Sequence, residues 1–417
     1  MNKSLLFLSR EARERPRHLV QLGLLSLFVA LTACGGGGAP TESAPPSANA
    51  ATDESQVNAA DLSPTNAQSL PSPTLPDTPM LAHAPSAPIS GQQSGELPSL
   101  TVNVLESARK VDPLPTPTLL HRKVVGGLIE PTDLVTASDG TLFFTERGRG
   151  LFVLRPGADA VSVFAEREVA PTSRSGMFAV ALDPEFTRNR FVYVLARTPG
   201  RGAEVGRVIR VVLDATYTRA TDRIDILTVP ISAALDPGQQ RLSVSKGDLR
   251  FGPDGYLYVS LGDKSQSTAS HAMQTLAGKL LRIDRNGQPA ANNKAPAGFD
   301  KRVYALGIRN PSAIFFHPDT EALLVGKRNP AAPDGSAVEL LRSPVWGAWR
   351  NAFAVTFDQG HRIDFVKIDS TGRTVHAVTV VEKLGVGFNG IVERPEGLYV
   401  MTRGRVGGDE IWRLSPL

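Results

Sequence analysis

The stretch Pro253-Asp254-Gly255-Tyr256-Leu257-Tyr258-Val259-Ser260 joins a tight turn to a short strand that ends in a small polar residue. The same pattern recurs at Ser138–Thr145 and at Pro395–Thr402, where Asp-Gly or Glu-Gly again precedes the strand. Such a repeat is typical of radial folds, because one small antiparallel sheet cannot bury its own face and must stack against copies of itself. We therefore predict an all-β fold, a β-propeller.

Further segments of β-forming residues, separated by Gly, Pro and Asp turns, fill the rest of the globular part. Its length fits a six-bladed propeller with blades of roughly 45–50 residues, and seven blades are left open. One short helix is predicted near Ser270–Ala277. The segments predicted as strands include Leu142–Thr145, Gly150–Leu154, Phe191–Ala196, Val208–Leu213, Leu257–Leu261, Leu280–Asp284, Ala322–Gly326, Phe353–Phe357, Phe365–Ile368 and Glu410–Leu414.

The first 33 residues have the pattern of a secretion signal. Basic residues between Lys3 and Arg17 precede an uncharged apolar run, Leu19–Ala33, which is short for a bilayer span. Leu31-Thr32-Ala33-Cys34 resembles a bacterial lipobox, so we expect a lipoprotein signal peptide over residues 1–33 and lipidation of Cys34; an uncleaved anchor with an incidental cysteine is the alternative. Because Gly35 follows the cysteine, the resemblance favours the outer membrane of the bacterial cell envelope, facing the periplasm.

Residues 34–100 are rich in Ala, Pro, Ser, Thr, Gln and Gly. Such a segment cannot bury enough apolar surface to offset its ordering entropy, so we expect a disordered tether ahead of a propeller over residues 101–417. Cys34 is the chain's one cysteine, which excludes an intramolecular disulfide. The formal charge of +4 falls to +1 without the leader, which holds five basic and two acidic residues, and this neutral balance argues against nucleic-acid binding.

Several motifs follow one another in the order found in a known family. They are Thr145–Leu151, Gly176–Phe186, Gly247–Asp263, Gly278–Ile283 and Tyr304–Pro311. Together they resemble the glucose/sorbosone dehydrogenases, the soluble sugar dehydrogenases that use pyrroloquinoline quinone (PQQ). Each motif is weak alone, but their succession is specific.

The resemblance implies a six-bladed propeller with PQQ on its top face beside a calcium ion. A histidine takes the proton from the anomeric hydroxyl of an aldose while hydride passes to the quinone. The match, which runs from about Gly126 to Gly326, aligns this base with Val244 and the aspartate before it with Ser243. A valine side chain cannot accept a proton, so the catalytic residue is left unassigned.

Other positions that contact cofactor or metal in that family also differ, and most of the cationic residues that would hold the anionic quinone are absent. PQQ and calcium are therefore cofactors that the family implies and the residues do not support. In this chain, Arg174 takes the place of a family glutamine, Asp248 that of an arginine, and Asp358 that of a lysine. The family's calcium segment corresponds to Lys327-Arg328-Asn329-Pro330 with Asp334 and Glu339, and its arginine pair corresponds to Gly387 and Asn389.

Arg309-Asn310 is the pair that persists, and in the family it touches the quinone. The guanidinium could hold a carboxylate or phosphate with two hydrogen bonds, or it could tie two blades together through backbone carbonyls. Asp263 likewise could supply a metal oxygen or cap a turn. Both alternatives stay open.

No histidine is an evident replacement for the base. His271 and His361 could face the central cleft, His317 belongs to a His-Pro turn that is structural in the family, and His376 fits a strand. No paired acids, Ser/His/Asp set or metal-binding histidine cluster is recognisable, so no metal ligand is assigned.

Two functions are compatible with these residues. The first is a catalytically impaired propeller that binds a small sugar, an envelope glycan or a protein, with the membrane reached through the lipid anchor. The second is a divergent PQQ-dependent sugar dehydrogenase that oxidises an aldose with a substitute base. A calcium-dependent lactonase-type hydrolase is a remote third, for which no ligand set is visible.

Overall fold

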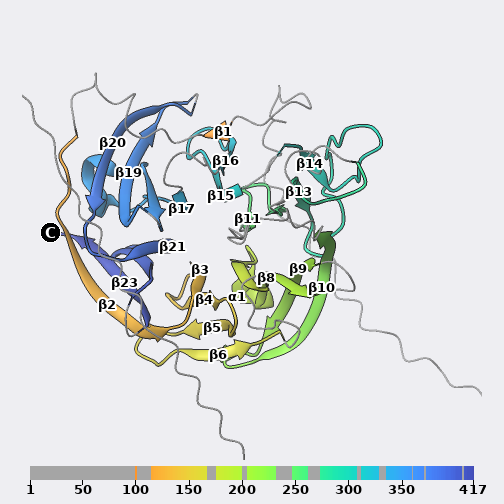
Figure 1. Cartoon of the computed structure of the whole chain (residues 1–417), viewed down its shortest axis with the longest axis horizontal. Helices are drawn as coiled ribbons and strands as arrows, with labels where there is room; N and C mark the ends of the chain where they lie inside the picture. Colours follow the sequence, from red (N-terminus) through yellow and green to blue (C-terminus); the bar gives the residue numbers. More distant parts are fainter. Residues whose placement is uncertain are drawn as a thin grey trace, which may run out of the picture. The chain divides into compact units, whose positions relative to one another are not determined.

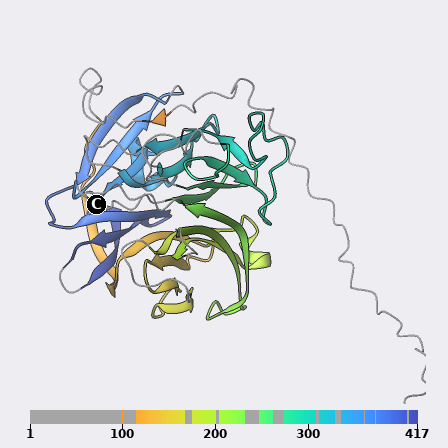
Figure 2. The same cartoon turned by 45° about the vertical axis from the view of Figure 1, so that its right-hand side comes forward.

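The computed structural model describes residues 99–100, 114–166, 175–199, 204–231, 247–261, 273–307, 311–327, 335–358, 360–370, 372–405 and 408–417 (Figures 1 and 2). All described elements belong to the compact unit Pro79–Leu417. The predicted signal peptide, Cys34 and the predicted tether as far as residue 98 lie outside the described residues. The last two residues of that tether, Ser99–Leu100, form strand β1.

Five antiparallel sheets of four strands make up most of the described chain. In each, the first strand lies at one edge and the following strands are added outward in order, except that the N-terminal β2 is the outermost strand of the last sheet. The sheets are β3 (Pro131–Thr136), β4 (Leu142–Glu146), β5 (Gly150–Leu154) and β6 (Val161–Phe164); β7 (Gly176–Leu182), β8 (Phe191–Pro199), β9 (Glu204–Leu213) and β10 (Ala220–Ile231); β11 (Asp248–Phe251), β12 (Leu257–Ser260), β13 (Leu280–Ile283) and β14 (Val303–Ala305); β17 (Gly335–Leu340), β18 (Phe353–Phe357), β19 (Arg362–Ile368) and β20 (Thr374–Val381); and β21 (Gly387–Arg394), β22 (Gly397–Arg403), β23 (Asp409–Pro416) and β2 (Leu119–Leu128).

The repeated turn forms as its residues require. In both Asp-Gly copies the aspartate side chain accepts a hydrogen bond from the backbone N–H two residues later. The N–H of Thr141 donates to Asp139 at 2.8 Å, and the N–H of Tyr256 donates to Asp254 at 3.2 Å. The glycines have φ values of +83° at Gly140 and +76° at Gly255, the left-handed region that other residues avoid. Every segment predicted as a strand lies in or overlaps one, and the all-β prediction is confirmed.

The helix predicted near Ser270–Ala277 is wrong where the structure describes it, since residues 273–277 form turns. The N–H groups of Ala277 and Gly278 bond to the Thr275 hydroxyl and the Leu261 carbonyl instead, and so short a segment could not offset the cost of nucleating a helix. The helices of the described residues are α1 (Phe186–Asn189) and the 3₁₀ helix η2 (Pro344–Trp349). Neither has the length and apolar character to cross a bilayer.

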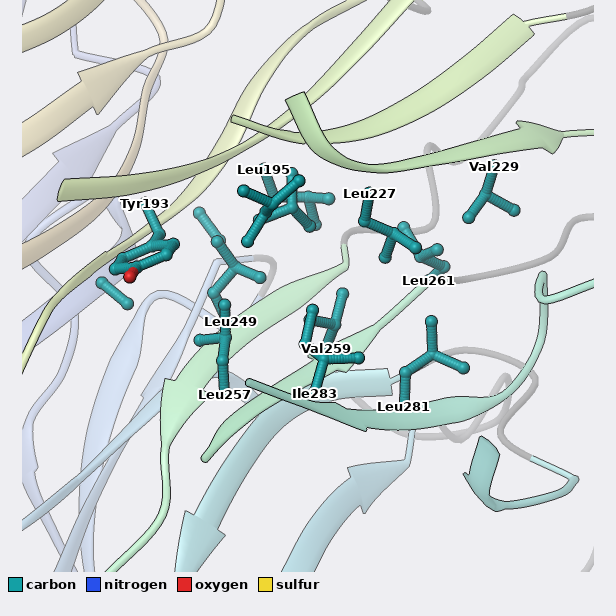
Figure 3. Close-up of a cluster of buried hydrophobic side chains, with 14 of the residues drawn as sticks. Tyr193, Leu195, Leu227, Val229, Leu249, Leu257, Val259, Leu261, Leu281 and Ile283 are labelled. Carbon is teal, nitrogen blue, oxygen red and sulfur yellow. The ribbon is translucent and has the colours of Figure 1, made fainter. Parts of the chain in front are cut away.

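The first strands of the sheets surround the axis of the molecule. β3 packs beside β7, β7 beside β11, β11 beside β15, β15 beside β17, β17 beside β21, and β21 beside β3, which closes the ring (Figure 1). Apolar side chains fill the space between neighbouring sheets. In Figure 3, Tyr193 and Leu195 of β8 face Leu249 of β11 and Val259 of β12. The fold is therefore a β-propeller, as predicted.

One sheet differs from the other five. β15 (Pro311–Phe316) pairs with β16 (Leu323–Lys327), and β1 adds to the far edge of β16 in parallel. Five complete four-stranded blades are thus present among the described residues. The count of six blades stays a prediction.

Candidate functional site

One face of the propeller is marked by the start of each inner strand. There the first residue of an inner strand pairs with a residue at or near the end of the next strand in sequence, and we call this the upper face. The pairs are Pro131 with Glu146, Gly176 with Arg197, Asp248 with Ser260, Pro311 with Lys327, Gly335 with Phe357, and Gly387 with Arg403.

The predicted site residues divide into two groups. Outside the described residues lie Cys34, Arg174, Ser243, Val244, Asp263, His271, Arg309, Asn310 and residues 328–334, so their predicted roles stay predictions. Within the described residues lie Asp248, Glu339, Asp358, Gly387 and Asn389.

Asp248, which aligns with a family arginine, is a structural residue. Its buried carboxylate accepts the N–H of Leu249 at 2.8 Å and the N–H of Ile314, in the neighbouring sheet, at 2.6 Å. Asp133 makes the same two kinds of contact, to the N–H of Leu134 and to that of Val180 in its own neighbouring sheet, each at 2.9 Å. Each aspartate precedes a leucine and stands six residues before the aspartate of a repeated turn. An acid at position 248 therefore joins two inner strands.

These two aspartates belong to a charged group around the axis that also contains Arg250 and Glu339. Burial, together with a smaller effect of the nearby Asp248 charge, raises the pKa of Asp133 to about 7. Burial also raises the pKa of Glu339, whose carboxylate lies 4.0 Å from the Arg250 guanidinium. Burial lowers the pKa of Arg250, but the charges of Asp248, Glu339 and Asp133 outweigh it and raise the value overall. Glu339, of the inner strand β17, thus lies beside an arginine of the inner strand β11.

At Asp358 the family's positive charge is replaced by an ion pair. The carboxylate lies 3.1 Å from the guanidinium of Arg403, on the neighbouring sheet, so a cation is still present on this face. Gly387 has no room for a side chain, because an added Cβ would lie 2.4 Å from the Asp358 carbonyl oxygen. Asn389 is fully buried and donates to the Pro131 carbonyl at 2.6 Å. The expected arginine pair is therefore replaced by contacts within the scaffold.

Two arginines flank Phe178 on the upper face, and sequence reasoning missed them. The guanidinium carbons of Arg147 and Arg197 lie 5.5 Å and 5.8 Å from the centre of the Phe178 ring. The register of β7 shifts at Phe178, which marks a bulge that re-aims this side chain. Phe178 belongs to no hydrophobic cluster of the described residues, and cation–π attraction favours the guanidiniums beside it.

Arg147 is the more accessible of the two arginines. Its side chain is 14% exposed and its acidic neighbour, Glu130, lies 3.5 Å away and is itself largely in solvent. Burial lowers the pKa of Arg147, Glu130 raises it, and the positive charge of Arg403 lowers it. An arginine stays charged at any physiological pH, so the effect of Arg403 indicates two cations close enough to repel each other. Glu130 and Asp358 already face these two arginines, so an anion would bind here in competition with both carboxylates.

The acids of the upper face are mostly engaged by neighbours. The buried carboxylate of Glu146 accepts from the Ile129 N–H and from Arg149, and burial raises its pKa. Asp409 accepts from the Arg405 N–H at 3.1 Å, and burial raises its pKa as well. Among the described residues, no three His, Cys, Asp or Glu side chains are grouped so that they could hold a metal ion.

The described histidines have structural positions. His317 is buried, its Nδ1 accepts the N–H of Asp319 and of Thr320, and its Nε2 donates to the Asp369 carbonyl at 3.2 Å. The structural role predicted for its turn is confirmed. His376 lies in β20, as predicted, and His361 occupies the turn between β18 and β19 with a φ of +49°.

The comparison with known proteins agrees with these motifs. A family model described as glucose/sorbosone dehydrogenase matches residues 128–335, the part of the chain that holds β3 to β16. The chain belongs to the glucose/sorbosone dehydrogenase family. The resemblance seen in the sequence is confirmed, and its limits agree closely with those of the match.

Three relatives of this family member illustrate its range. Quinoprotein glucose dehydrogenase B of Acinetobacter calcoaceticus is 23% identical over 263 residues, which cover 57% of this chain and 54% of the relative. Hedgehog-interacting protein of Mus musculus is 24% identical over 227 residues, which cover 48% of this chain and 32% of the relative. The chain thus spans about half or less of the length of these curated relatives. The PQQ-bound aldose sugar dehydrogenase of Streptomyces coelicolor shares the fold, with a TM-score of 0.58 at 18% identity. The match covers 72% of this chain and 99% of that structure.

Proposed function

We propose that this chain is a six-bladed propeller that binds a carboxylate-bearing sugar or envelope glycan on its upper face and does not oxidise it. We further propose that lipidated Cys34 holds it at the outer membrane, on the periplasmic side. The observation that supports ligand binding most directly is the arrangement of Arg147 and Arg197 around Phe178, with Arg403 nearby.

The arginines are suited to a carboxylate because they are held in place before a ligand arrives. Phe178 is 4% exposed, so its ring is a covered support for the two guanidiniums and is not itself a surface for stacking. A planar guanidinium can give a carboxylate two parallel hydrogen bonds, and a partly buried one does so with less screening than one in bulk solvent. A neutral sugar lacks the group that such a site would recognise.

Replacement of the family's base supports binding over oxidation. The family's proton acceptor aligns with Val244, and the described histidines are engaged in turns and strands. One relative is named for interaction and not for a dehydrogenase activity, so the family's fold is compatible with a binding role.

The second candidate function is a divergent dehydrogenase. PQQ bears carboxylates that Arg147 and Arg197 would fit, and when bound it would supply the hydride acceptor. Asp409 is one acid of the upper face whose pKa is raised by burial, so it is a candidate to hold a proton. In the segment that aligns with the family's calcium ligands, the sequence has Lys327-Arg328-Asn329-Pro330 in place of the expected acidic residue, and this disfavours the second candidate.

Calorimetric titration of the full chain with Cys34→Ser tests the binding role. We expect glucuronate or oligogalacturonate to bind, neutral glucose and cellobiose to bind at least tenfold more weakly, and the double variant Arg147→Ala, Arg197→Ala to lose binding. Arg188→Ala removes an arginine of α1 whose side chain is 79% exposed, and it is the matched control. Equal affinity for charged and neutral sugars would contradict the proposal.

Dye reduction in the presence of PQQ, calcium and a panel of aldoses tests the alternative. Turnover that is lost in Asp409→Asn would establish the dehydrogenase and overturn the binding role. We expect no turnover. The anchor is tested separately by incorporation of labelled fatty acid, which we expect in the natural chain and not in Cys34→Ser.

A further inference from the structure

The acid that faces Arg147 is fixed at its backbone and exposed at its side chain. Glu130 stands in the turn between β2 and β3, and its carbonyl accepts the Arg147 N–H at 3.0 Å. The preceding N–H, of Ile129, donates to the Glu146 carboxylate at 3.1 Å. These two bonds hold residue 130 beside Arg147. The Glu130 side chain itself is 56% exposed, and its carboxylate lies 3.5 Å from the Arg147 guanidinium.

The backbone conformation of residue 130 gives no reason for a glutamate. Its φ is +47°, in the left-handed region that glycine and asparagine adopt more easily than other residues. Pro131 follows, and a residue before proline prefers an extended conformation. A residue that is kept in such a conformation often serves a function. What the glutamate adds here is a carboxylate that faces Arg147.

Arg147 is the fixed member of this ion pair. Its carbonyl accepts the Met177 N–H at 2.9 Å, and its aliphatic stem lies against Gly176, where an added Cβ would collide with the Arg147 Cγ. Its guanidinium carbon lies 5.5 Å from the centre of the Phe178 ring. The contact with Glu130, at 3.5 Å, is longer than the about 2.7–2.9 Å of a charge-assisted hydrogen bond. A ligand would therefore displace the acid and leave the arginine in place.

The second ion pair of the upper face is more tightly built. The charged atoms of Asp358 and Arg403 are 3.1 Å apart, and the two side chains are only about one-third exposed. Gly387 packs against the backbone and the carboxylate of Asp358 so closely that a Cβ would not fit between them. Of the two acids that face the arginines, Glu130 is thus the one that can leave.

We propose that Glu130 is an internal competitor for the anion site: its carboxylate occupies Arg147 while the site is empty and moves into solvent when a ligand carboxylate takes its place. This inference rests on the proposed binding function. The exchange excludes weak anions, because a ligand must offer more than the single contact that it replaces. A ligand carboxylate does so, since it can give the guanidinium two parallel hydrogen bonds. Removal of the competitor should strengthen binding, whereas removal of a residue that positions Arg147 would weaken it.

Calorimetric titration with glucuronate tests the sign of this effect in the full chain with Cys34→Ser. We expect Glu130→Gln to bind about twofold to fivefold more tightly than the parent chain, the range that an exposed ion pair allows. Glu185→Gln is the matched control, because Glu185 is 45% exposed and pairs with Arg188 at 3.2 Å beside α1, beyond the far end of β7. We expect it to leave the affinity unchanged. Equal or weaker binding by Glu130→Gln would overturn the proposal.

Labelling of arginines with phenylglyoxal tests the contact without any sugar. The reagent attacks the neutral guanidine, a form that a facing carboxylate disfavours. We expect Arg147 to be labelled about twofold or more faster in Glu130→Gln than in the parent chain, as measured by mass spectrometry after digestion. Arg188 should be labelled equally in both. Equal labelling of Arg147 would overturn the proposal whether or not glucuronate binds. Faster labelling without glucuronate binding by either chain would refute the proposed function and still show that Glu130 covers Arg147.

Discussion

The carboxylate of Asp248 accepts the backbone N–H of Ile314 at 2.6 Å and thereby joins β11 to β15. Asp133 joins β3 to β7 in the same way, through the N–H of Val180 at 2.9 Å. A propeller has no covalent link between its blades besides the connecting loops, so contacts of this kind hold the inner strands in register around the axis. At the position of the family's arginine, this chain therefore has an aspartate, Asp248, that links two inner strands.

We expect Asp248→Ala to lower the free energy of unfolding by about 2–4 kcal/mol. It leaves the N–H groups of Leu249 and Ile314 without their acceptor, and an unsatisfied buried donor costs about 1–3 kcal/mol. Urea unfolding monitored by tryptophan fluorescence measures the change. Asp222→Ala is the control, since Asp222 accepts the next residue's N–H at 2.8 Å but is exposed and joins no second sheet. Equal losses in both variants would show that the link between sheets adds nothing.

The raised pKa of Asp133 predicts a pH dependence of stability. The folded-state pKa of about 7 exceeds the ordinary value of 3.8, so the folded protein holds this proton more tightly than the unfolded chain does. The resulting stabilisation is complete below about pH 4 and is lost as the pH rises to about 7. We expect the free energy of unfolding to decline over that interval by at most about 1.4 kcal/mol per pH unit from this group.

Asp133→Asn isolates this contribution, because an amide does not titrate. The variant should be less stable at pH 4, since one of the N–H groups of Leu134 and Val180 loses its oxygen acceptor, but its decline between pH 4 and 7 should be shallower. Denaturant unfolding at several pH values gives both slopes, with Asp222→Asn as a variant that keeps the natural slope. Parallel curves for the natural chain and Asp133→Asn would contradict the assignment.

The propeller is readable from the sequence because its signals are local. Asp254 and Gly255 act on residues two or three positions away, so the turn and the strand after it are encoded together. The roles of Asp248 and Arg147 are not local. Asp248 binds a residue 66 positions later in the chain, and Arg147 and Arg197, 50 positions apart, both lie close to the ring of Phe178, where the register of β7 shifts. Nothing in the residue types alone identifies such contacts.

The ion pair of Asp358 and Arg403 should tolerate reversal but not a single change. Asp358→Lys restores the charge expected from the family and sets it against Arg403, and Arg403→Asp sets two carboxylates together. Each single variant should lose about 1 kcal/mol of stability, because both side chains are only about one-third exposed, and the double variant should recover most of it. A double-mutant cycle from urea unfolding gives the coupling energy. A coupling near zero would mean that solvent screens this pair completely.

Gly387 shows why the family's arginine cannot simply be restored. A Cβ at this position would lie 2.4 Å from both the carbonyl oxygen and a carboxylate oxygen of Asp358, so even Gly387→Ala must displace backbone of the neighbouring sheet. We expect a loss of about 1–3 kcal/mol in the free energy of unfolding, and at least as much for Gly387→Arg. Gly126→Ala is the control, because the nearest atom to its Cβ would be 3.5 Å away and no positive φ is involved.

The pair of glycine variants separates crowding from the general effect of replacing glycine in a strand. If Gly387→Ala proved as stable as Gly126→Ala, the close approach of β21 to Asp358 would have to relax at no cost. Position 387 could then accept a larger side chain. The added positive charge would fall next to Arg403 on the upper face, and the loss of the family's arginine pair would no longer have a steric explanation. We expect the opposite, with Gly387→Ala clearly the less stable of the two.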